Sequence, residues 1–508
     1  MTNIRTGFNG ETMMHSQRWL ILAIISSALF LIVIDMTVLY TALPTLTREL
    51  QASASEKLWI VNSYALVVSG LLLGMGTLSD RLGHKRLFIA GLAIFGVASL
   101  CAAFSPTPGW LIAARSLLAV GAAVMMPATL SIIRMTFTDE RERSMAIGIW
   151  AAVASGGAAF GPVLGGALLE YFWWGSVFLI NVPIVLVALV LGVMLIPGHP
   201  GNSKKRWDLW GSVQVMIGLI GIAYAIKELG KRAPSFATAA VVFAIGLAFM
   251  VWFVRRQRHK AQPMIDFKIF NNPGFTAAVA SAMVATTVLI GMELVFTQRL
   301  QLVMGLSPLQ AGLFILPLPL ASFVSGPLTG HWLQRVGSQR MLFWALLVSS
   351  IGMAAYLLLY NANIGAQIAS LIVLGLGLGA TMTAASSTIM NSASQDQAGM
   401  AASIEEVSFE LGGAIGVTLM GSILSAVYAA SMVIPAGMQV PAMVSDSLDE
   451  ALITAEAMTT ESAATLTALA RAAFDQGFVA VLAVSALLLL VAAIVVRLKT
   501  TDQVPVKA

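Results

Sequence analysis

The chain has 508 residues, of which 58% are hydrophobic and only 10% are charged. A soluble protein of this length would carry about a quarter charged residues, so the composition excludes a water-soluble fold. The formal net charge of +5 does not indicate a nucleic-acid partner, because the basic residues lie between long apolar runs, as in a multi-pass membrane protein. A single cysteine and five scattered histidines exclude a disulfide framework and predict neither a metal site nor a cofactor.

Fourteen apolar runs are each long enough to cross a bilayer, which takes about 20 residues. In chain order they are 19–42, 58–78, 87–105, 110–133, 146–169, 175–196, 209–227, 236–254, 275–298, 310–333, 341–360, 365–390, 399–428 and 476–496. The first run is too long for a signal peptide and shows no convincing cleavage site, so we expect it to be retained. An even number of spans places both termini on one side. The excess of Lys and Arg in the loops of that side predicts that it is the cytoplasm.

An internal repeat divides the chain into two halves. The segment 76–83 follows the second span, and 330–337 follows the tenth with glycines and an arginine in the same register. Repeated halves of this kind are typical of transporters, and spans seven and eight are then an insert. We therefore predict an all-α integral membrane protein with an N-terminal six-helix bundle at 1–197, an inserted helix pair at 198–270, and a C-terminal six-helix bundle at 271–508 that carries an outer hairpin at about 429–475.

Several motifs resemble those of a known family. GTLSDRLGHKR at 76–86 is similar to the cytoplasmic loop motif of the major facilitator superfamily, and GAAFGPVLGG at 157–166 resembles the antiporter motif of that superfamily's fifth span. DMTVLYTALP at 35–44, WIVNSY at 59–64 and WDLWG at 207–211 resemble the fourteen-span drug:proton antiporter family. The resemblance implies the major facilitator fold, with two six-helix bundles and two inserted helices.

The same resemblance implies a function and a location. It implies a monomeric, proton-coupled multidrug efflux antiporter in the bacterial inner membrane, surrounded by membrane lipids, rather than an enzyme. Its partners would be protons and cationic amphiphilic drugs and biocides, including quaternary ammonium compounds, dyes and viologens. The chain departs from the family at two places. Leu118 and Ala119 replace the usual Gln-Gly after the arginine of the fourth span. Asn62 stands where some relatives carry an acid, which argues against a strong preference for dications.

Asp35 is the only charge in the first apolar run. An ionised carboxylate in hydrocarbon costs several kcal/mol, so it is retained where a cavity, a proton or a cation meets it. We predict a cation or proton site; the alternative is a hydrogen bond to a neighbouring helix. Arg115 is a lone cation in the fourth span and should meet an acid or backbone carbonyls. By resemblance it assists proton coupling, although it could instead extend to the interface from a span end.

Four glutamates are the other candidate proton or cation sites. Glu293 lies in span nine, near the repeat position of Asp35, and we expect the two to face each other. In span thirteen Glu406 and Glu410 share a helical face, whereas Glu405 points about 100° away. Crowded carboxylates of this kind hold protons near neutral pH. We expect Glu410 to line the cavity; Glu405 and Glu406 could instead be hydrated at the cytoplasmic end.

Aromatic side chains near these acids are candidate cation partners, because a ring face contributes about 0.5–2 kcal/mol to a desolvated cation. They are Tyr40, Trp59, Tyr64, Trp150, Phe296 and Phe409. Aromatic residues occur throughout the chain, so each ring taken alone is more often a packing or lipid-facing residue.

Two motifs are assigned a conformational role. Gly157, Gly161 and Gly165 form a smooth stripe that lets another helix approach closely, and Pro162 permits a bend; the resemblance implies that this stripe, with Gly166, seals the pathway. The loop residues are Gly76, Asp80, Arg81, Gly83 and Arg86. We predict that Asp80 and Arg81 form an ionic latch; the alternative is a solvated loop.

The sequence contains no Gly-Lys-Ser/Thr phosphate cradle, so transport would be secondary rather than driven by a nucleotide. The acidic segment at about 429–475 is either a solvated hairpin or a gate or vestibule that concentrates cations. Two other functions stay open: a specific metabolite or siderophore exporter on the same scaffold, and a transport-dead membrane sensor. An anionic substrate would need basic residues in the cavity, and Arg115 is the one candidate.

Overall fold

The computed structural model describes residues 15–198, 201, 207–229, 234–260, 263, 265–392, 398–435, 438 and 440–501, and every regular element within these ranges is helical. The N-terminal half contains α1 (His15–Leu50), α2 (Ala54–Leu82), α3 (His84–Ala103), α4 (Pro108–Thr136), α5 (Glu140–Tyr171), α6 (Ser176–Leu179) and α7 (Asn181–Leu195). The inserted pair is α8 (Leu209–Leu229) and α9 (Phe236–Arg258). The C-terminal half contains η1 (Phe267–Asn271), α10 (Pro273–Gln298), η2 (Arg299–Val303), α11 (Pro308–Ile315), α12 (Pro317–Val336), α13 (Ser338–Leu359), α14 (Ile364–Ser392), α15 (Ala398–Ser431), η4 (Ala442–Ser445), α16 (Leu448–Glu456) and α17 (Thr460–Thr501).

Twelve helical segments in the described part of the chain are long and apolar enough to cross a membrane. A helix satisfies its own backbone hydrogen bonds, which is why apolar runs in lipid take this form. The α6–α7, α10–η2 and α11–α12 pairs each make one span. Helices α2 and α5 have 29 and 32 residues but are not among the twelve, and several of their side chains lie outside the described set. The all-helical membrane fold is therefore confirmed, whereas the count of fourteen stays a prediction.

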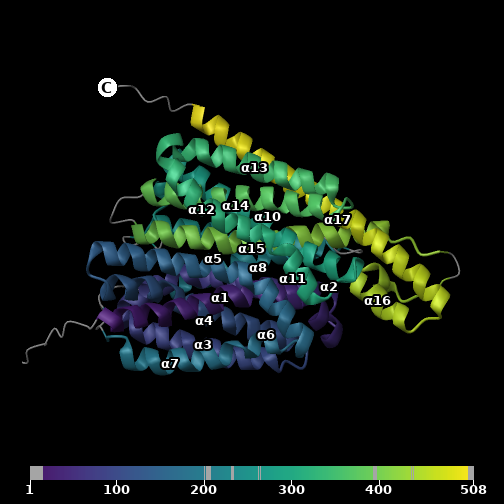
Figure 1. The fold of residues 1–508 in the computed structure, drawn as a ribbon, viewed down its shortest axis with the longest axis horizontal. Helices are drawn as coiled ribbons and strands as arrows, with labels where there is room; N and C mark the ends of the chain where they lie inside the picture. Colours follow the sequence, from purple (N-terminus) through teal and green to yellow (C-terminus); the bar gives the residue numbers. More distant parts are fainter. Residues whose placement is uncertain are drawn as a thin grey trace, which may run out of the picture.

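Each half has its own hydrophobic core. One cluster of buried side chains runs from Ile21 to Ile196 and also takes in Leu294 and Val417 of the other half, and a second cluster runs from Ile269 to Val496. In Figure 1 the helices of the N-terminal half, purple to blue, stack beside the green and yellow helices of the C-terminal half. Helix α1 begins and α17 ends toward the left of this view, whereas α16 and the start of α17 project at the right. We call these ends the terminal side and the hairpin side.

The internal repeat is visible as one turn made twice. Gly83 has φ 97° and Gly337 has φ 85°, a left-handed region that glycine adopts without steric cost. Each closes its preceding helix in the same way, since the Gly83 amide donates to the Ser79 carbonyl and the Gly337 amide to the Leu333 carbonyl, both at 2.9 Å. The repeated glycines are therefore required by backbone geometry.

Contacts between the halves gather on the hairpin side. The Lys57 ammonium of α2 pairs with Asp449 of α16 and donates to Gln298 of α10 at 2.9 Å. A Cβ on Gly166 of α5 would lie 2.5 Å from the Leu309 Cα of α11, so these two helices touch backbone to backbone. The described contacts thus close the space between the halves toward the hairpin.

Candidate functional site: a cavity between the halves

A cavity of about 650 Å³ lies between the two halves. Helix α1 contributes Leu29, Ile32, Val33, Met36 and Thr37 to its wall, a spacing that follows one helical face. The rest of the N-terminal wall is Met126, Trp150 and Pro162. A wall of this kind suits an apolar guest, because pockets for small molecules are mostly apolar with few polar groups.

Among the described residues that line the cavity, the charged ones are acids, and they come from the C-terminal half. Glu293 of α10 and Glu406 and Glu410 of α15 line it. Glu410 is only 7% exposed, and its Oε2 has no hydrogen-bond partner among the described residues. A buried carboxylate oxygen without a partner is costly, so Glu410 needs a proton or a cation. Glu405 lies outside the lining set and has a hydrogen bond with Ser386 instead.

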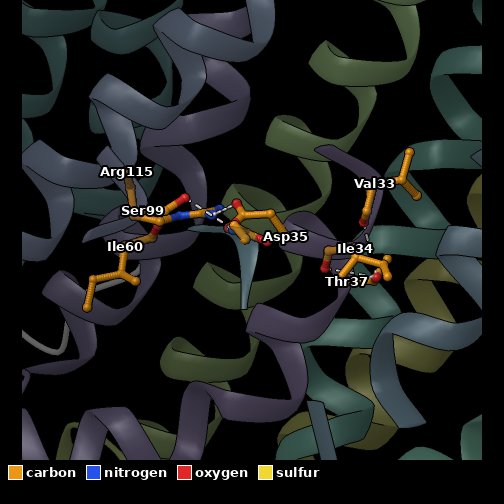
Figure 2. A network of polar contacts seen from close by, with 8 residues as sticks. Val33, Ile34, Asp35, Thr37, Ile60, Ser99 and Arg115 are labelled. Atoms are coloured by element: carbon orange, nitrogen blue, oxygen red, sulfur yellow. Dashed lines mark hydrogen bonds and ion pairs between the residues drawn. The ribbon is translucent and has the colours of Figure 1, made fainter. Parts of the chain in front are cut away.

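Asp35 lies off the cavity-facing stripe of α1. Arg115 Nη1 donates to its Oδ2 at 2.5 Å, and Asn181 Nδ2 donates to its Oδ1 at 3.3 Å. The side chains of Arg115 and Asp35 are 2% and 0% exposed. In Figure 2, Asp35 points toward Arg115 and Ser99, whereas Val33 and Thr37 lie on the other side of α1. Glu293 faces the cavity, so the expectation that Asp35 and Glu293 face each other is wrong for this structure.

Arg115 is a buried member of this network rather than a snorkelling side chain. We expected Arg115 to meet an acid or a backbone carbonyl, and it meets both, because its Nε also donates to the Ile60 carbonyl at 3.3 Å. Its guanidinium carbon lies 4.7 Å from the Tyr64 ring centroid. Asn181, which also donates to Ser99 Oγ at 3.2 Å, was missed by the sequence analysis. Its signal was a lone amide in the apolar run 175–196.

The six candidate aromatics divide into two groups. Trp150, Phe296 and Phe409 line the cavity. Tyr40 and Tyr64 are buried at 4% and 1% exposure and do not line it. Trp59 instead carries the Lys227 ammonium 4.6 Å above its ring. These three rings therefore lie outside the described cavity wall and follow the alternative reading, in which a ring packs within the protein.

The glycine stripe of α5 packs against α1. A Cβ on Gly161 would lie 2.7 Å from the Thr37 Cβ, and one on Gly165 3.0 Å from Val38 Cγ1. Gly157 faces Val33 at 3.3 Å. Gly161 has no room for a side chain, since real Cβ atoms do not approach neighbours so closely, whereas at Gly165 a side chain would fit only if Val38 moved by a few tenths of an ångström. Gly166, which follows Gly165, contacts α11 of the other half, and so does Pro162.

The loop motif at 76–86 is only partly described. Gly76 lies near Pro127, with 3.9 Å from a built Cβ to the Pro127 Cβ. Arg81 and Arg86 are exposed. The Asp80 side chain lies outside the described residues, so the ionic latch with Arg81 stays a prediction.

Comparison with known proteins identifies the family. Residues 25–417 match the sequence family described as the Major Facilitator Superfamily. The chain is 41% identical to the methyl viologen resistance protein SmvA of Salmonella typhimurium over 86% of this chain and 89% of that one. It is 38% identical to the multidrug efflux pump LfrA of Mycolicibacterium smegmatis over 98% and 99%. A crystal structure of a bacterial homolog to the human lysosomal transporter Spinster superposes with a TM-score of 0.68 at 16% identity, covering 97% of this chain and 100% of that one. The chain belongs to the major facilitator superfamily and is similar to its bacterial drug-resistance exporters.

Proposed function

We propose that the chain is a proton-coupled multidrug efflux antiporter that exports lipophilic and quaternary ammonium cations. The observation that carries the proposal is an apolar cavity whose described charged residues are all carboxylates, with Glu410 buried and its Oε2 without a hydrogen-bond partner among the described residues. An anionic metabolite or siderophore would need a cation in the wall. The described lining residues include no Lys or Arg, and Arg115 is already paired with Asp35.

Export follows if a proton and a drug compete for the same carboxylates. In the arrangement described here, closed on the hairpin side, an ionised Glu410 or Glu293 would accept a cation from the terminal side. After the halves rock, protons from the hairpin side would displace the cation. One carboxylate cannot hold both guests, which is the condition for exchange. The proposed orientation places the terminal side, with both termini, in the cytoplasm of a bacterial inner membrane.

Asp35 and Arg115 have a separate role in this proposal. Because their pair is sealed from the cavity, a drug does not contact Asp35. Protonation of Asp35 would cancel its attraction to Arg115 and free the guanidinium, so the pair would link proton uptake to the packing of α1 against α4. We therefore assign Asp35 to coupling and the cavity glutamates to the guest.

Apolar walls and rings would give the site its breadth. Trp150 and Phe409 can each contribute about 0.5–2 kcal/mol to a desolvated cation, and the aliphatic α1 face accepts guests of many shapes. Two carboxylates on different helices, Glu293 and Glu410, would allow a dication to be balanced.

We also propose the division into a bundle at 1–197, an insert at 198–270 and a bundle at 271–508.

Transport in proteoliposomes tests the proposal. The purified protein is reconstituted with a pH gradient, and uptake of tetraphenylphosphonium and of methyl viologen is followed. Wild-type protein should transport both cations only when the gradient is present, and Glu410→Gln should weaken this transport. Glu405→Gln is the matched control, because it changes a neighbouring carboxylate outside the cavity wall, and it should retain transport. Gradient-independent transport, or equal losses in both variants, would contradict the proposal.

A further inference from the structure

Helix α9 is the least buried of the twelve candidate spans. Only 17% of its apolar stretch is buried, against 50% for α8. Helix α8 packs against α2, α15 and α9, and it meets α9 closely, since a Cβ on Gly221 would lie 2.9 Å from the Gly246 Cα. Lys227 near the end of α8 donates to the Ser55 carbonyl at the start of α2, on the hairpin side. Helix α9 returns from there, so it ends on the terminal side with most of its surface facing the membrane.

The exposed face of α9 is an apolar stripe one leaflet long. Val241, Ile245, Ala248 and Trp252 are all exposed, and they are spaced by three or four residues, so they share one side of the helix. A helix rises about 1.5 Å per residue, so the stripe from Val241 to Trp252 is about 17 Å long. That is close to half of the roughly 30 Å hydrocarbon core of a bilayer. An acyl chain of one leaflet therefore has the length to lie along the stripe.

The same side of α9 ends in positive charge. Arg255 and His259 follow Trp252 by three and seven residues, so they continue the stripe by one and two turns. Both are exposed, and so is Arg258 beside them. The His259 Nδ1 donates to the Arg255 carbonyl at 2.7 Å, which holds the imidazole at this end of the helix. The apolar stripe therefore leads directly into a cationic helix end.

A buried aspartate neutralises the other basic residues of this helix end. Asp208 pairs with Arg256 at 2.8 Å and with Lys260. Burial raises the pKa of Asp208, but the hydrogen bonds that it accepts outweigh this effect and lower that pKa to about 2. The donors are Lys260, Gln257, Arg256 and the Gly211 amide. The carboxylate is thus ionised and committed to these partners, and no acid in the described part of the chain forms an ion pair with Arg255 or Arg258.

Two tryptophans mark the level at which the apolar stripe meets these cations. Trp210 of α8 and Trp252 of α9 are 45% and 49% exposed, and their rings meet edge to face with centroids 5.9 Å apart. Tryptophan is enriched at the interface between membrane and water, so the two rings indicate the headgroup level. Arg255 and Arg258 follow on the water side, at the depth of the lipid phosphates. An arginine fork binds a phosphate through two parallel hydrogen bonds.

We propose that the inserted pair binds an anionic phospholipid of the terminal-side leaflet, with an acyl chain along the stripe from Val241 to Trp252 and the phosphate at Arg255 and Arg258. Basic residues gathered at the end of a span attract anionic lipids in this way. A soluble phosphate ester meets the cations but not the stripe, so the apolar contact selects the lipid. The lipid anchors α9 and, through α8, steadies the packing on α2 and α15. This site is independent of the proposed efflux function.

Lipid binding to the purified protein tests the proposal. Native mass spectrometry compares phosphatidylglycerol with phosphatidylcholine of the same acyl chains on delipidated protein, and wild-type protein should bind phosphatidylglycerol more tightly. Arg255→Gln with Arg258→Gln should weaken that binding about 25-fold, because each basic residue contributes about a factor of five to the attraction of an anionic lipid. The matched control, Arg134→Gln with Arg340→Gln, removes two exposed charges from α4 and α13 and should bind as wild type does.

Equal binding of the two lipids, or equal losses in the two double variants, would overturn the site. Glycerol phosphate carries the headgroup chemistry without acyl chains and should not displace the lipid; displacement at similar concentrations would show a soluble-phosphate site instead and refute the proposal. A second measurement uses the wild-type protein and so does not depend on how the variants fold. Phosphatidylglycerol with a photoactivatable acyl chain should crosslink to the peptide that contains residues 241–252. Crosslinks confined to other helices would overturn the site.

Discussion

The buried Asp35–Arg115 pair makes the sharpest prediction about stability. Breaking a buried ion pair by removing one partner costs about 3–5 kcal/mol, because the other charge stays buried without compensation. Asp35→Asn leaves Arg115 at 2% exposure with the Ile60 carbonyl and the Tyr64 ring as its described partners. We therefore expect Asp35→Asn to be destabilised toward the lower end of that range. Adding Arg115→Gln removes the orphan charge and should recover more than half of the loss.

The pH dependence gives this prediction its control. Arg115→Met leaves a carboxylate that can take up a proton, so its destabilisation should shrink as the pH falls from 8 to 5. Asp35→Asn leaves a guanidinium that keeps its proton in proteins, so its destabilisation should not depend on pH. Thermal unfolding of the detergent-solubilised variants, followed by size-exclusion chromatography, measures both effects. A double variant no more stable than Asp35→Asn, or the same pH response in the two single variants, would refute the buried-pair reasoning.

The remaining predictions concern the cavity, the glycine stripe and the hairpin. Glu410→Gln should weaken vesicle transport of a viologen dication more than that of a monovalent ammonium compound. Glu405→Gln should change the transport of neither drug. Equal losses for both drugs in Glu410→Gln would leave Glu410 a proton site without a role in selectivity. Gly161→Leu should abolish transport while drug binding stays measurable by calorimetry. The control Gly109→Leu changes a position where an added Cβ has nothing within 4 Å, and it should transport normally. Normal transport by Gly161→Leu would show that the stripe is not tightly packed. Lys57→Met leaves the Asp449 carboxylate of α16 buried at 5% exposure without its ion pair. The contact on the hairpin side should therefore be destabilised by about 3–5 kcal/mol, which is measured as a longer distance between spin labels on α4 and on the hairpin. An unchanged distance distribution would contradict this.

Helical spacing predicted the cavity acids well and misplaced Asp35. The period of 3.6 residues separates Glu406 and Glu410 from Glu405, and the structure places the first two in the cavity wall and the third outside it. The same period, applied to Leu29, Ile32, Val33, Met36 and Thr37, would have put Asp35 on another face of α1. A lone intramembrane charge was interpreted as a cavity marker, but a partner eighty positions away in the sequence, Arg115, neutralises it. Such pairing depends on tertiary packing and has no local signal.

The repeat predicted the two halves, whereas the position of the insert was not predictable. Gly83 and Gly337 share a turn that the sequence register indicates directly. Helix α8 packs against α2 and α15 through small residues such as Gly70 and Ala414. Small residues are common throughout this chain, so they do not mark one surface as the contact for α8. The aromatics show the same limit, because a ring such as Trp59 looks alike in sequence whether it faces a drug or a lysine.

Proton release on drug binding measures the competition between drug and proton at the cavity carboxylates without requiring transport. Tetraphenylphosphonium is added to the purified, weakly buffered protein in detergent, and the released protons are counted with a pH indicator while binding is followed by calorimetry. We expect binding to release protons from the wild-type protein, the affinity to rise with pH, and Glu410→Gln to release fewer protons than Glu405→Gln. Binding without proton release, with an affinity that does not change with pH, would contradict competition at these carboxylates.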